Sequence, residues 1–239
     1  AFEQFPDFYK FRELDIPESG DAIPDLLNEI KWNLDWIATM QDSDGSVYHK
    51  LTTLGWPGKE MPADDTRDRY VIGKSTTAAL NFAAVMSVAS RIFSEYEKEF
   101  PGVSQQWLTS AESAWNWALA NNSLAYTQPS DVESGQYGDD YFNDEFSWAA
   151  AELFITTENA DYLTHYQNYR QGISAPGWQY VAALATISLL SKGEQIVSEP
   201  LFSDIKSELT NLADQYLTQQ ATNNYATAMQ ASDFVWGSN

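Results

Sequence analysis

Apolar residues recur every three or four positions along most of the chain, which is the spacing of an amphipathic helix rather than of a strand. The clearest case lies in residues 135–155, where an acidic, aromatic loop leads into a helix with this apolar spacing: Phe146, Ala149, Ala150, Leu153 and Phe154. Asn143 is the predicted N-cap of that helix. The same spacing predicts helices over roughly residues 22–41, 76–99, 103–120, 160–170, 178–192 and 200–217.

No stretch shows the alternation of apolar and polar residues that marks a half-buried strand. The sequence therefore predicts an all-α fold of about seven helices joined as hairpins. Residues 1–21 predict an irregular segment before the first helix. Residues 47–75 have no clear period, and we expect this long loop to be functional because it contains His49, Trp56 and several charged residues.

The stretch Asp42-Ser43-Asp44-Gly45 ends the first predicted helix and resembles the start of an EF-hand calcium loop. The twelfth position of such a loop holds a Glu, whereas this chain has Thr53 there. We therefore interpret the stretch as a plain turn.

Composition describes an acidic chain with enough apolar residues for a substantial core. Of its 239 residues, 44% are hydrophobic and 14% aromatic, and 34 acidic against 13 basic residues give a formal charge of −21. That charge repels nucleic acid and anionic membranes, and it favours cations or positively charged ligands without excluding neutral ones. The absence of Cys excludes a thiolate nucleophile and Cys-ligated zinc within this sequence. No apolar run approaches the roughly 18 residues that suggest a membrane span.

Four carboxylates lie within seven residues around Asn143, with no Lys or Arg nearby: Asp139, Asp140, Asp144 and Glu145. In one interpretation, Asp144 and Glu145 are ordinary acids of the first helical turn, where negative charge complements the helix dipole. In the other, the cluster binds a hard cation such as calcium, which prefers carboxylate and carbonyl oxygens.

Four ordered blocks of the chain together resemble glycoside hydrolase family nine, whose members are mostly endo-β-1,4-glucanases built on an (α/α)6 barrel. The blocks are Asp15–Thr53, Ser75–Phe93, Gly135–Thr157 and the closing VWGSN at residues 235–239. The resemblance implies an all-α fold of the (α/α)6 barrel type, of which this chain covers only the central helical hairpins. Residues 1–239 are then a single domain, a partial catalytic module that lacks both catalytic ends.

The activity that the resemblance implies is hydrolysis of β-1,4-glycosidic bonds with inversion, in cellulose or a related β-glucan. The family's catalytic base lies in an Asp-x-Gly-Asp motif and its acid is a Glu near the far end of the module. The near match Glu18-Ser19-Gly20-Asp21 sits in a block that follows that motif in the family, so we reject it. We expect both catalytic groups to lie outside residues 1–239, and this chain alone to be inactive.

The resemblance also implies binding residues. His49, Trp178 and Trp236 match positions near the family's glycan groove, although residue type alone favours a loop imidazole bonded to backbone for His49. Relatives use the acidic pair for calcium, which maps the ligands onto the following positions: Asp139, Asp140, Tyr141, Asp144 and Glu145. We expect the Trp residues inside predicted helices to pack in the core: Trp32, Trp36, Trp115, Trp117 and Trp148.

Two alternatives stay open beside the endoglucanase. An exo-β-glucosaminidase of the same family would act on chitosan oligomers, which an acidic surface attracts. A non-catalytic helical module would bind glycan or protein through the same aromatic loops. The expected partner is a β-linked glycan, with no nucleic acid and no membrane. We further expect a secreted or periplasmic protein, and either self-association or a remainder of the module that covers exposed helix faces.

Overall fold

The computed structural model describes residues 1–192, 195–230 and 233. The chain divides into two compact units, Ala1–Phe142 and Asn143–Asn239, and each has its own helices and buried residues. The prediction of a single domain over residues 1–239 stays a prediction. Apolar spacing in the sequence thus produces helical layers within each unit.

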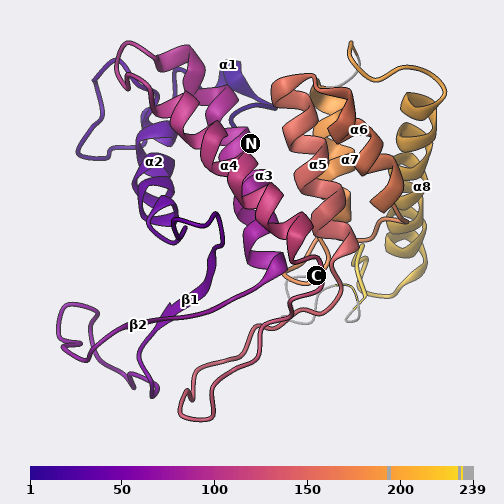
Figure 1. The fold of residues 1–239 in the computed structure, drawn as a ribbon. Helices are drawn as coiled ribbons and strands as arrows, with labels where there is room; N and C mark the ends of the chain where they lie inside the picture. The colour runs from indigo at the N-terminus through magenta and orange to yellow at the C-terminus, as the bar shows by residue number, and fades with distance from the viewer. Residues whose placement is uncertain (193–194, 231–232, 234–239) are drawn as a thin grey trace. The chain divides into compact units, whose positions relative to one another are not determined.

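The first unit is built on a pair of long helices, α3 (Thr76–Phe93) and α4 (Val103–Ala120), which lie side by side as a hairpin (Figure 1). The hydroxyl of Ser75 accepts the N–H of Ala78 at 3.1 Å, so α3 begins with a side-chain cap. Both helices bury alanines completely, which lets their backbones approach closely: Ala79, Ala83, Ala84, Ala111, Ala114 and Ala118.

Shorter elements surround this pair in the first unit. Helix α1 (Pro6–Tyr9) is a single turn within the predicted irregular segment, and α2 (Asp25–Ala38) packs on α3. The 3₁₀ turn η1 (Ser94–Tyr96) follows α3, so the helix predicted to reach residue 99 ends in a tighter turn. The stretch Thr76–Tyr96 is long and apolar enough to cross a membrane, yet 67% of its apolar 18-residue window is buried, as in a core helix.

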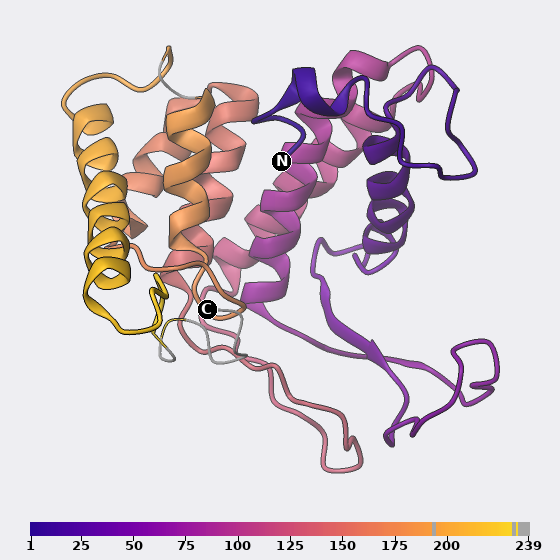
Figure 2. The same cartoon turned by 180° about the vertical axis from the view of Figure 1, so that it is seen from behind.

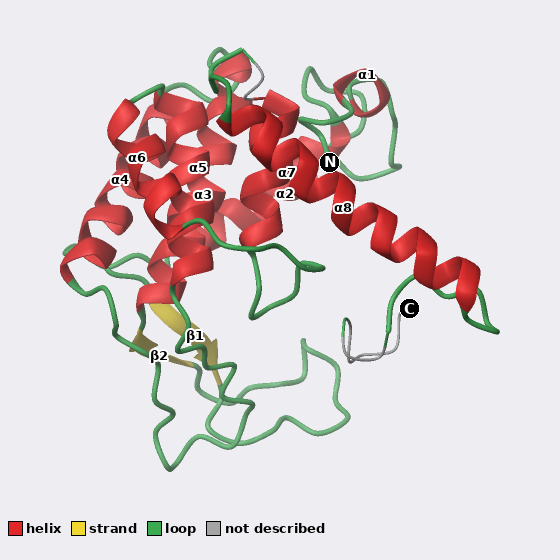
Figure 3. Ribbon diagram, turned by 90° about the vertical axis from the view of Figure 1, so that its right-hand side faces the viewer, coloured by secondary structure: helices red, strands yellow, loops and turns green. Residues whose placement is uncertain are grey.

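The prediction that residues 47–75 contain no strand is wrong. Strands β1 (Tyr48–Thr52) and β2 (Tyr70–Lys74) pair antiparallel, with Lys50 opposite Ile72, and Figure 3 shows them in yellow with the long loop that joins them. Of the ten strand residues only Ile72 is buried, so the sequence lacks the alternation that would reveal a strand. Ile72 packs instead in a small cluster with Tyr126 and Val132, outside the hairpin.

The second unit consists of α5 (Asn143–Thr157), α6 (Ala160–Tyr169), α7 (Ala182–Lys192) and α8 (Leu201–Thr222). Figure 2 shows these helices from behind; α5 contacts α6 and α7, and α7 contacts α8. The apolar character predicted for α5 is confirmed, because these residues are at most 1% exposed: Phe146, Ala149, Ala150, Ala151 and Leu153. Helix α5 is therefore the core of its unit.

The predicted helices are all present, and their ends differ where a backbone group finds a partner outside the helix. Helix α7 begins at Ala182 rather than near Trp178, because Gly177 and Tyr180 exchange backbone hydrogen bonds of 2.9 and 3.3 Å before it. Helix α2 begins at Asp25, whose carboxylate accepts the backbone N–H of Leu14 at 2.7 Å. Local hydrogen bonds of this kind are invisible to a search for apolar period.

Candidate functional site

His49 lies on β1 within a ring of neighbours from the first unit. Its imidazole stacks on Tyr126, with ring centroids 4.0 Å apart and planes 4° from parallel, and its Nδ1 lies 3.0 Å from the Ser75 hydroxyl. Burial lowers the pKa of His49, against the opposing effect of hydrogen bonds to the backbone of Gln136 and Tyr137. A half-buried imidazole with a lowered pKa is neutral at pH 7, so it offers one donor and one acceptor.

These contacts bear on both interpretations of His49. The bonds to backbone match the loop-imidazole interpretation, while the ring keeps part of its surface exposed to solvent. A fixed, neutral, partly exposed imidazole whose nitrogens bond within the chain can still line a glycan groove with its exposed edge. Its role in glycan binding stays a prediction.

Trp178 lies in the segment before α7 and is 51% exposed. The backbone bonds between Gly177 and Tyr180 hold this segment as a tight turn, so the indole is presented on a defined backbone. An exposed indole face can stack on the apolar face of a pyranose ring. Trp178 belongs to the second unit and His49 to the first, so the structure gives the surroundings of each separately. Trp236 lies outside the described residues.

The two acids at the start of α5 are buried, unlike ordinary first-turn acids. Asp144 and Glu145 are each 1% exposed. One carboxylate oxygen of Asp144, Oδ2, accepts the backbone N–H of Val181 at 2.8 Å, and the other, Oδ1, has no hydrogen-bond partner among the described residues. A buried carboxylate oxygen without a partner is costly, and a bound cation would satisfy it.

The remaining predicted calcium ligands lie in the loop that precedes α5, within the first unit. Asp139 accepts the N–H of Tyr141 at 3.0 Å in a local turn, and Asp140 and Tyr141 are exposed. Across the described part of the chain, no three His, Cys, Asp or Glu side chains converge to hold a metal. The donor set at α5 therefore fits calcium only if backbone carbonyls or water supply most of the ligands.

The turn at Asp42 agrees with the prediction of a plain turn. The N–H of Gly45 bonds to the carbonyl of Asp42 at 3.0 Å, and Gly45 has a φ of 90°. Lys74 donates to the Asp42 carboxylate at 2.8 Å and, with the backbone of Ser43, lowers the pKa of Asp42 to about 2. The carboxylate at the start of the stretch is thus paired with a lysine.

Several residues that matter to these sites were not predicted as such. Lys50 and Tyr126 surround His49, and only the adjacency of Lys50 to His49 hinted at either. Glu152 on α5 is 1% exposed and accepts hydrogen bonds from the Trp148 indole at 3.0 Å and from the Ser188 hydroxyl at 2.5 Å. Trp148, expected to serve packing alone, is thus also a hydrogen-bond donor.

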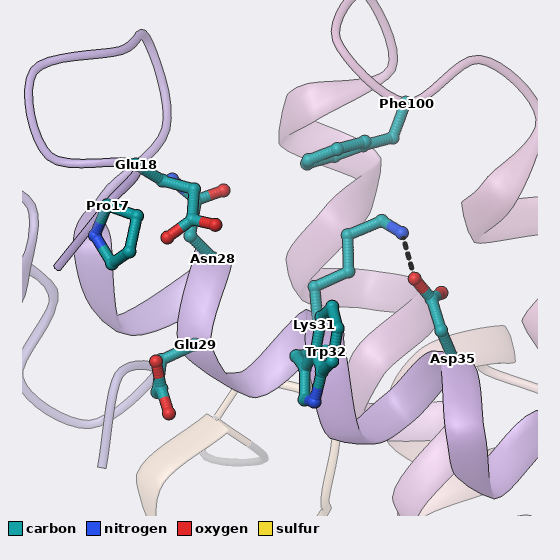
Figure 4. A pocket seen from close by; sticks show the side chains of 8 residues that line it. All are labelled: Pro17, Glu18, Asn28, Glu29, Lys31, Trp32, Asp35 and Phe100. Atoms are coloured by element: carbon teal, nitrogen blue, oxygen red, sulfur yellow. Dashed lines mark hydrogen bonds and ion pairs between the residues drawn. The ribbon is translucent and has the colours of Figure 1, made fainter.

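A pocket of about 390 Å³ lies beside α2 (Figure 4). Lys31 lines the pocket and donates a hydrogen bond of 2.6 Å to the carboxylate of Asp35. This ion pair neutralises one of the carboxylates that line the pocket. The prediction that helical Trp residues pack in the core is wrong for Trp32 and Trp36, which are 83% and 46% exposed. Both indoles lie on one face of α2, and much of their surface is exposed to solvent.

Comparison of the sequence with known proteins identifies one family of glycoside hydrolases. The family profile "Glycosyl hydrolase family 9" matches residues 1–239. The chain is 39% identical to the xyloglucan-specific endo-β-1,4-glucanase BoGH9A of Bacteroides ovatus over 99% of its own length and 42% of that protein. It is 29% identical to endoglucanase D of Acetivibrio thermocellus, over 100% of the chain and 39% of the relative.

Solved structures of family 9 enzymes superpose on this chain. A Bacteroides ovatus GH9 structure superposes with a TM-score of 0.90 and 39% identity, over 98% of this chain and 45% of that one. A metagenome-derived family 9 endoglucanase gives a TM-score of 0.87 and 29% identity, over 96% and 42%. The chain spans less than half the length of these relatives, and the all-α fold class of the (α/α)6 type, covered in part, is confirmed. On the match of its whole length, the chain belongs to glycosyl hydrolase family 9.

Proposed function

We propose that the protein carrying this chain hydrolyses β-1,4-glycosidic bonds in cellulose or a related β-glucan, with residues 1–239 as part of a larger catalytic module. The observation that carries this proposal is the family match over residues 1–239, supported by 39% identity to an enzyme named for action on xyloglucan. The proposed reaction inverts the anomeric centre, with a carboxylate base and a carboxylic acid supplied from outside this chain.

In this proposal the chain contributes the wall of the glycan groove. His49, neutral and held flat against Tyr126, lines the groove with the part of its imidazole that stays exposed. Trp178 stacks on a sugar ring, because its indole is half exposed on a hydrogen-bonded turn. Trp236 is proposed to do the same. These contacts orient the substrate, which is the chain's contribution to rate.

We propose that calcium fixes the start of α5. The carboxylates of Asp144 and Glu145 would bind the ion. Further oxygen ligands would come from the segment Asp139–Tyr141, either from the carboxylates of Asp139 and Asp140 or from main-chain carbonyls. Two buried acids, one with a carboxylate oxygen lacking a partner, support this assignment. The ion would supply charge neutralisation and rigidity rather than chemistry at the glycosidic bond.

Two further proposals concern the localisation of the protein and its partners. Because a polymeric glycan is found outside the cytoplasm, we propose that the protein is secreted or periplasmic. The exposed indoles of α2 require a cover, which we assign to the remainder of the module or to a second copy.

The test is hydrolysis by the full-length protein that contains residues 1–239. Carboxymethylcellulose, xyloglucan and chitosan oligomers are the substrates, and proton NMR follows the configuration of the first product. We expect reducing ends from a β-glucan and an initial α-anomer, the signature of inversion at a β-linkage. Release from chitosan alone would favour the exo-β-glucosaminidase. Glycan binding without hydrolysis would favour the non-catalytic module and overturn the proposal.

A further inference from the structure

Lys50 follows His49 on β1, and its ammonium group is fully engaged by one neighbouring segment. Nζ donates to the Gln128 side-chain oxygen at 2.6 Å, the Ser134 hydroxyl at 3.0 Å and the Gly135 carbonyl at 2.8 Å. An ammonium has three donors, and all three are used. The acceptors are neutral, and burial lowers the pKa of Lys50. A partly buried charge that bonds to three groups of one segment fixes the position of that segment.

The segment that Lys50 holds, residues 126–137, is the one that surrounds His49, and we call it the 126–137 loop. At one end, Tyr126 stacks on the imidazole, and at the other, the backbone of Gln136 and Tyr137 bonds to it. Lys50 binds the loop between these two ends and also lies 5.7 Å from the centre of the Tyr126 ring. The loop's position decides both contacts of the imidazole.

Other contacts show that the 126–137 loop is built to receive this lysine. The Gln128 amide donates to the carbonyls of Val132 and Ser134 at 2.9 and 2.5 Å, which turns its oxygen toward Lys50. On β2, a Cβ at Gly73 would lie 2.5 Å from the Tyr126 ring, so only glycine leaves room for the ring beside His49. The loop and the hairpin are thus fitted to each other around the His49–Tyr126 stack.

The geometry points to Lys50 as a positioning residue for glycan binding: it holds the 126–137 loop against β1 and so keeps Tyr126 flat on His49. Lys50 itself does not touch the sugar. This inference rests on the proposed function for its effect on activity, but its structural part can be measured without substrate. The competing explanation is that Lys50 only stabilises the fold.

The test compares Lys50→Met, which keeps the length of the stem and removes the donors, with Lys74→Met in the full-length protein. Lys74 is the matched control, because it lies on the paired strand and contacts Asp42 and the Tyr48 ring instead of the 126–137 loop. We expect Lys50→Met to raise KM for a β-1,4-glucan about tenfold with little change in kcat, and Lys74→Met to leave KM unchanged. Lys50→Arg should restore part of the loss.

A double-mutant cycle with His49→Ala separates positioning from simple stabilisation. If Lys50 acts through His49, Lys50→Met adds little in the His49→Ala background. Additive effects, or a wild-type KM for Lys50→Met, would overturn the inference. If Lys50→Met does not fold, Gln128→Leu removes the acceptor of the shortest Lys50 hydrogen bond and is tested in the same double-mutant cycle.

A substrate-free readout keeps this inference distinct from the proposed function. In the full-length protein, the Tyr126 ring current should shift the His49 ring protons upfield in the NMR spectrum. Lys50→Met should reduce that shift, and Lys74→Met should preserve it. A reduced shift in a protein that hydrolyses no β-glucan would contradict the proposed function alone, whereas a preserved shift in Lys50→Met contradicts the inference.

Discussion

Asp144 Oδ2 accepts the backbone N–H of Val181 at 2.8 Å, which joins the first turn of α5 to the residue before α7. A second carboxylate on α5, Glu152, bonds to Ser188 of α7 at 2.5 Å. Two buried acids therefore set α7 in register with α5. The turn that carries Trp178 ends at this first link, so the position of the proposed stacking residue depends on a carboxylate of the core helix.

Replacing Asp144 with Ala should destabilise the protein by about 1–3 kcal/mol, because the N–H of Val181 then loses its acceptor in a buried place. Val181 is 7% exposed, so water does not readily take over. Urea unfolding of the full-length protein measures the difference. Asp161→Ala is the control, since Asp161 is an exposed first-turn acid of α6. Equal losses for the two variants would contradict the role given to the Asp144–Val181 bond.

Excess calcium should raise the melting temperature of the full-length protein, and a chelator should lower it, because an ion that binds only the folded state stabilises it by linkage. Asp144→Asn should greatly reduce the calcium-dependent shift, while Asp161→Asn should keep it. Equal melting temperatures with no calcium by elemental analysis would leave Asp144 and Glu145 as structural acids only.

The helices were predictable from the sequence because their signal is local. Helix α4 matches its predicted ends, and α5 begins at Asn143, one residue earlier than the predicted N-cap at that position implies. The hairpin of β1 and β2 was not predictable, because it is stabilised by contacts with the distant 126–137 loop. Lys50 and Gly73 meet Tyr126 there, and neither produces an apolar period.

In the candidate site too, the features that depend on local sequence were predictable, and those that depend on distant contacts were not. Residue type and family resemblance indicated His49 and the acids of α5. The burial of Asp144 was not predicted, because its hydrogen-bond donor is the backbone N–H of Val181. Val181 lies beyond α6, too far along the chain for a local pattern to indicate the contact. The exposure of Trp32 was also missed, since an apolar residue at helical spacing predicts a buried face without saying which neighbour covers it.

The pKa of His49 predicts a pH dependence of stability. Burial lowers this pKa below the value of about 6.5 in the unfolded chain, so the unfolded state binds more protons between the two values. The contribution of neutral His49 is therefore complete above about pH 6.5 and is lost as the pH falls through that value toward the folded-state pKa. Unfolding free energies from about pH 7.5 to about pH 5.5 should fall less steeply for His49→Gln than for wild type. Equal slopes for His49→Gln and wild type would contradict the prediction.

Residues 1–239 alone should show no turnover, because the carboxylates that the family uses as base and acid are expected outside them. Carboxymethylcellulose and chitosan oligomers are incubated with the isolated chain, with the full-length protein as the positive control. Sustained release of reducing sugar by the isolated chain above a buffer blank would show that a catalytic pair lies within it.

The isolated chain should also associate or bind an apolar dye, because large side chains of the first unit lack cover: Phe11 is 85% exposed, Trp32 83% and Trp36 46%. Each such side chain, once covered, contributes on the order of 1.5–3 kcal/mol, and together they rival the stability of a whole domain. Sedimentation should therefore show species larger than a monomer, and Trp32→Gln should reduce them. The full-length protein should bind less dye per molecule, since the rest of the module is proposed to cover α2. A clean monomer with a sharp cooperative melt and no dye binding would mean that these faces are stable in water without a partner.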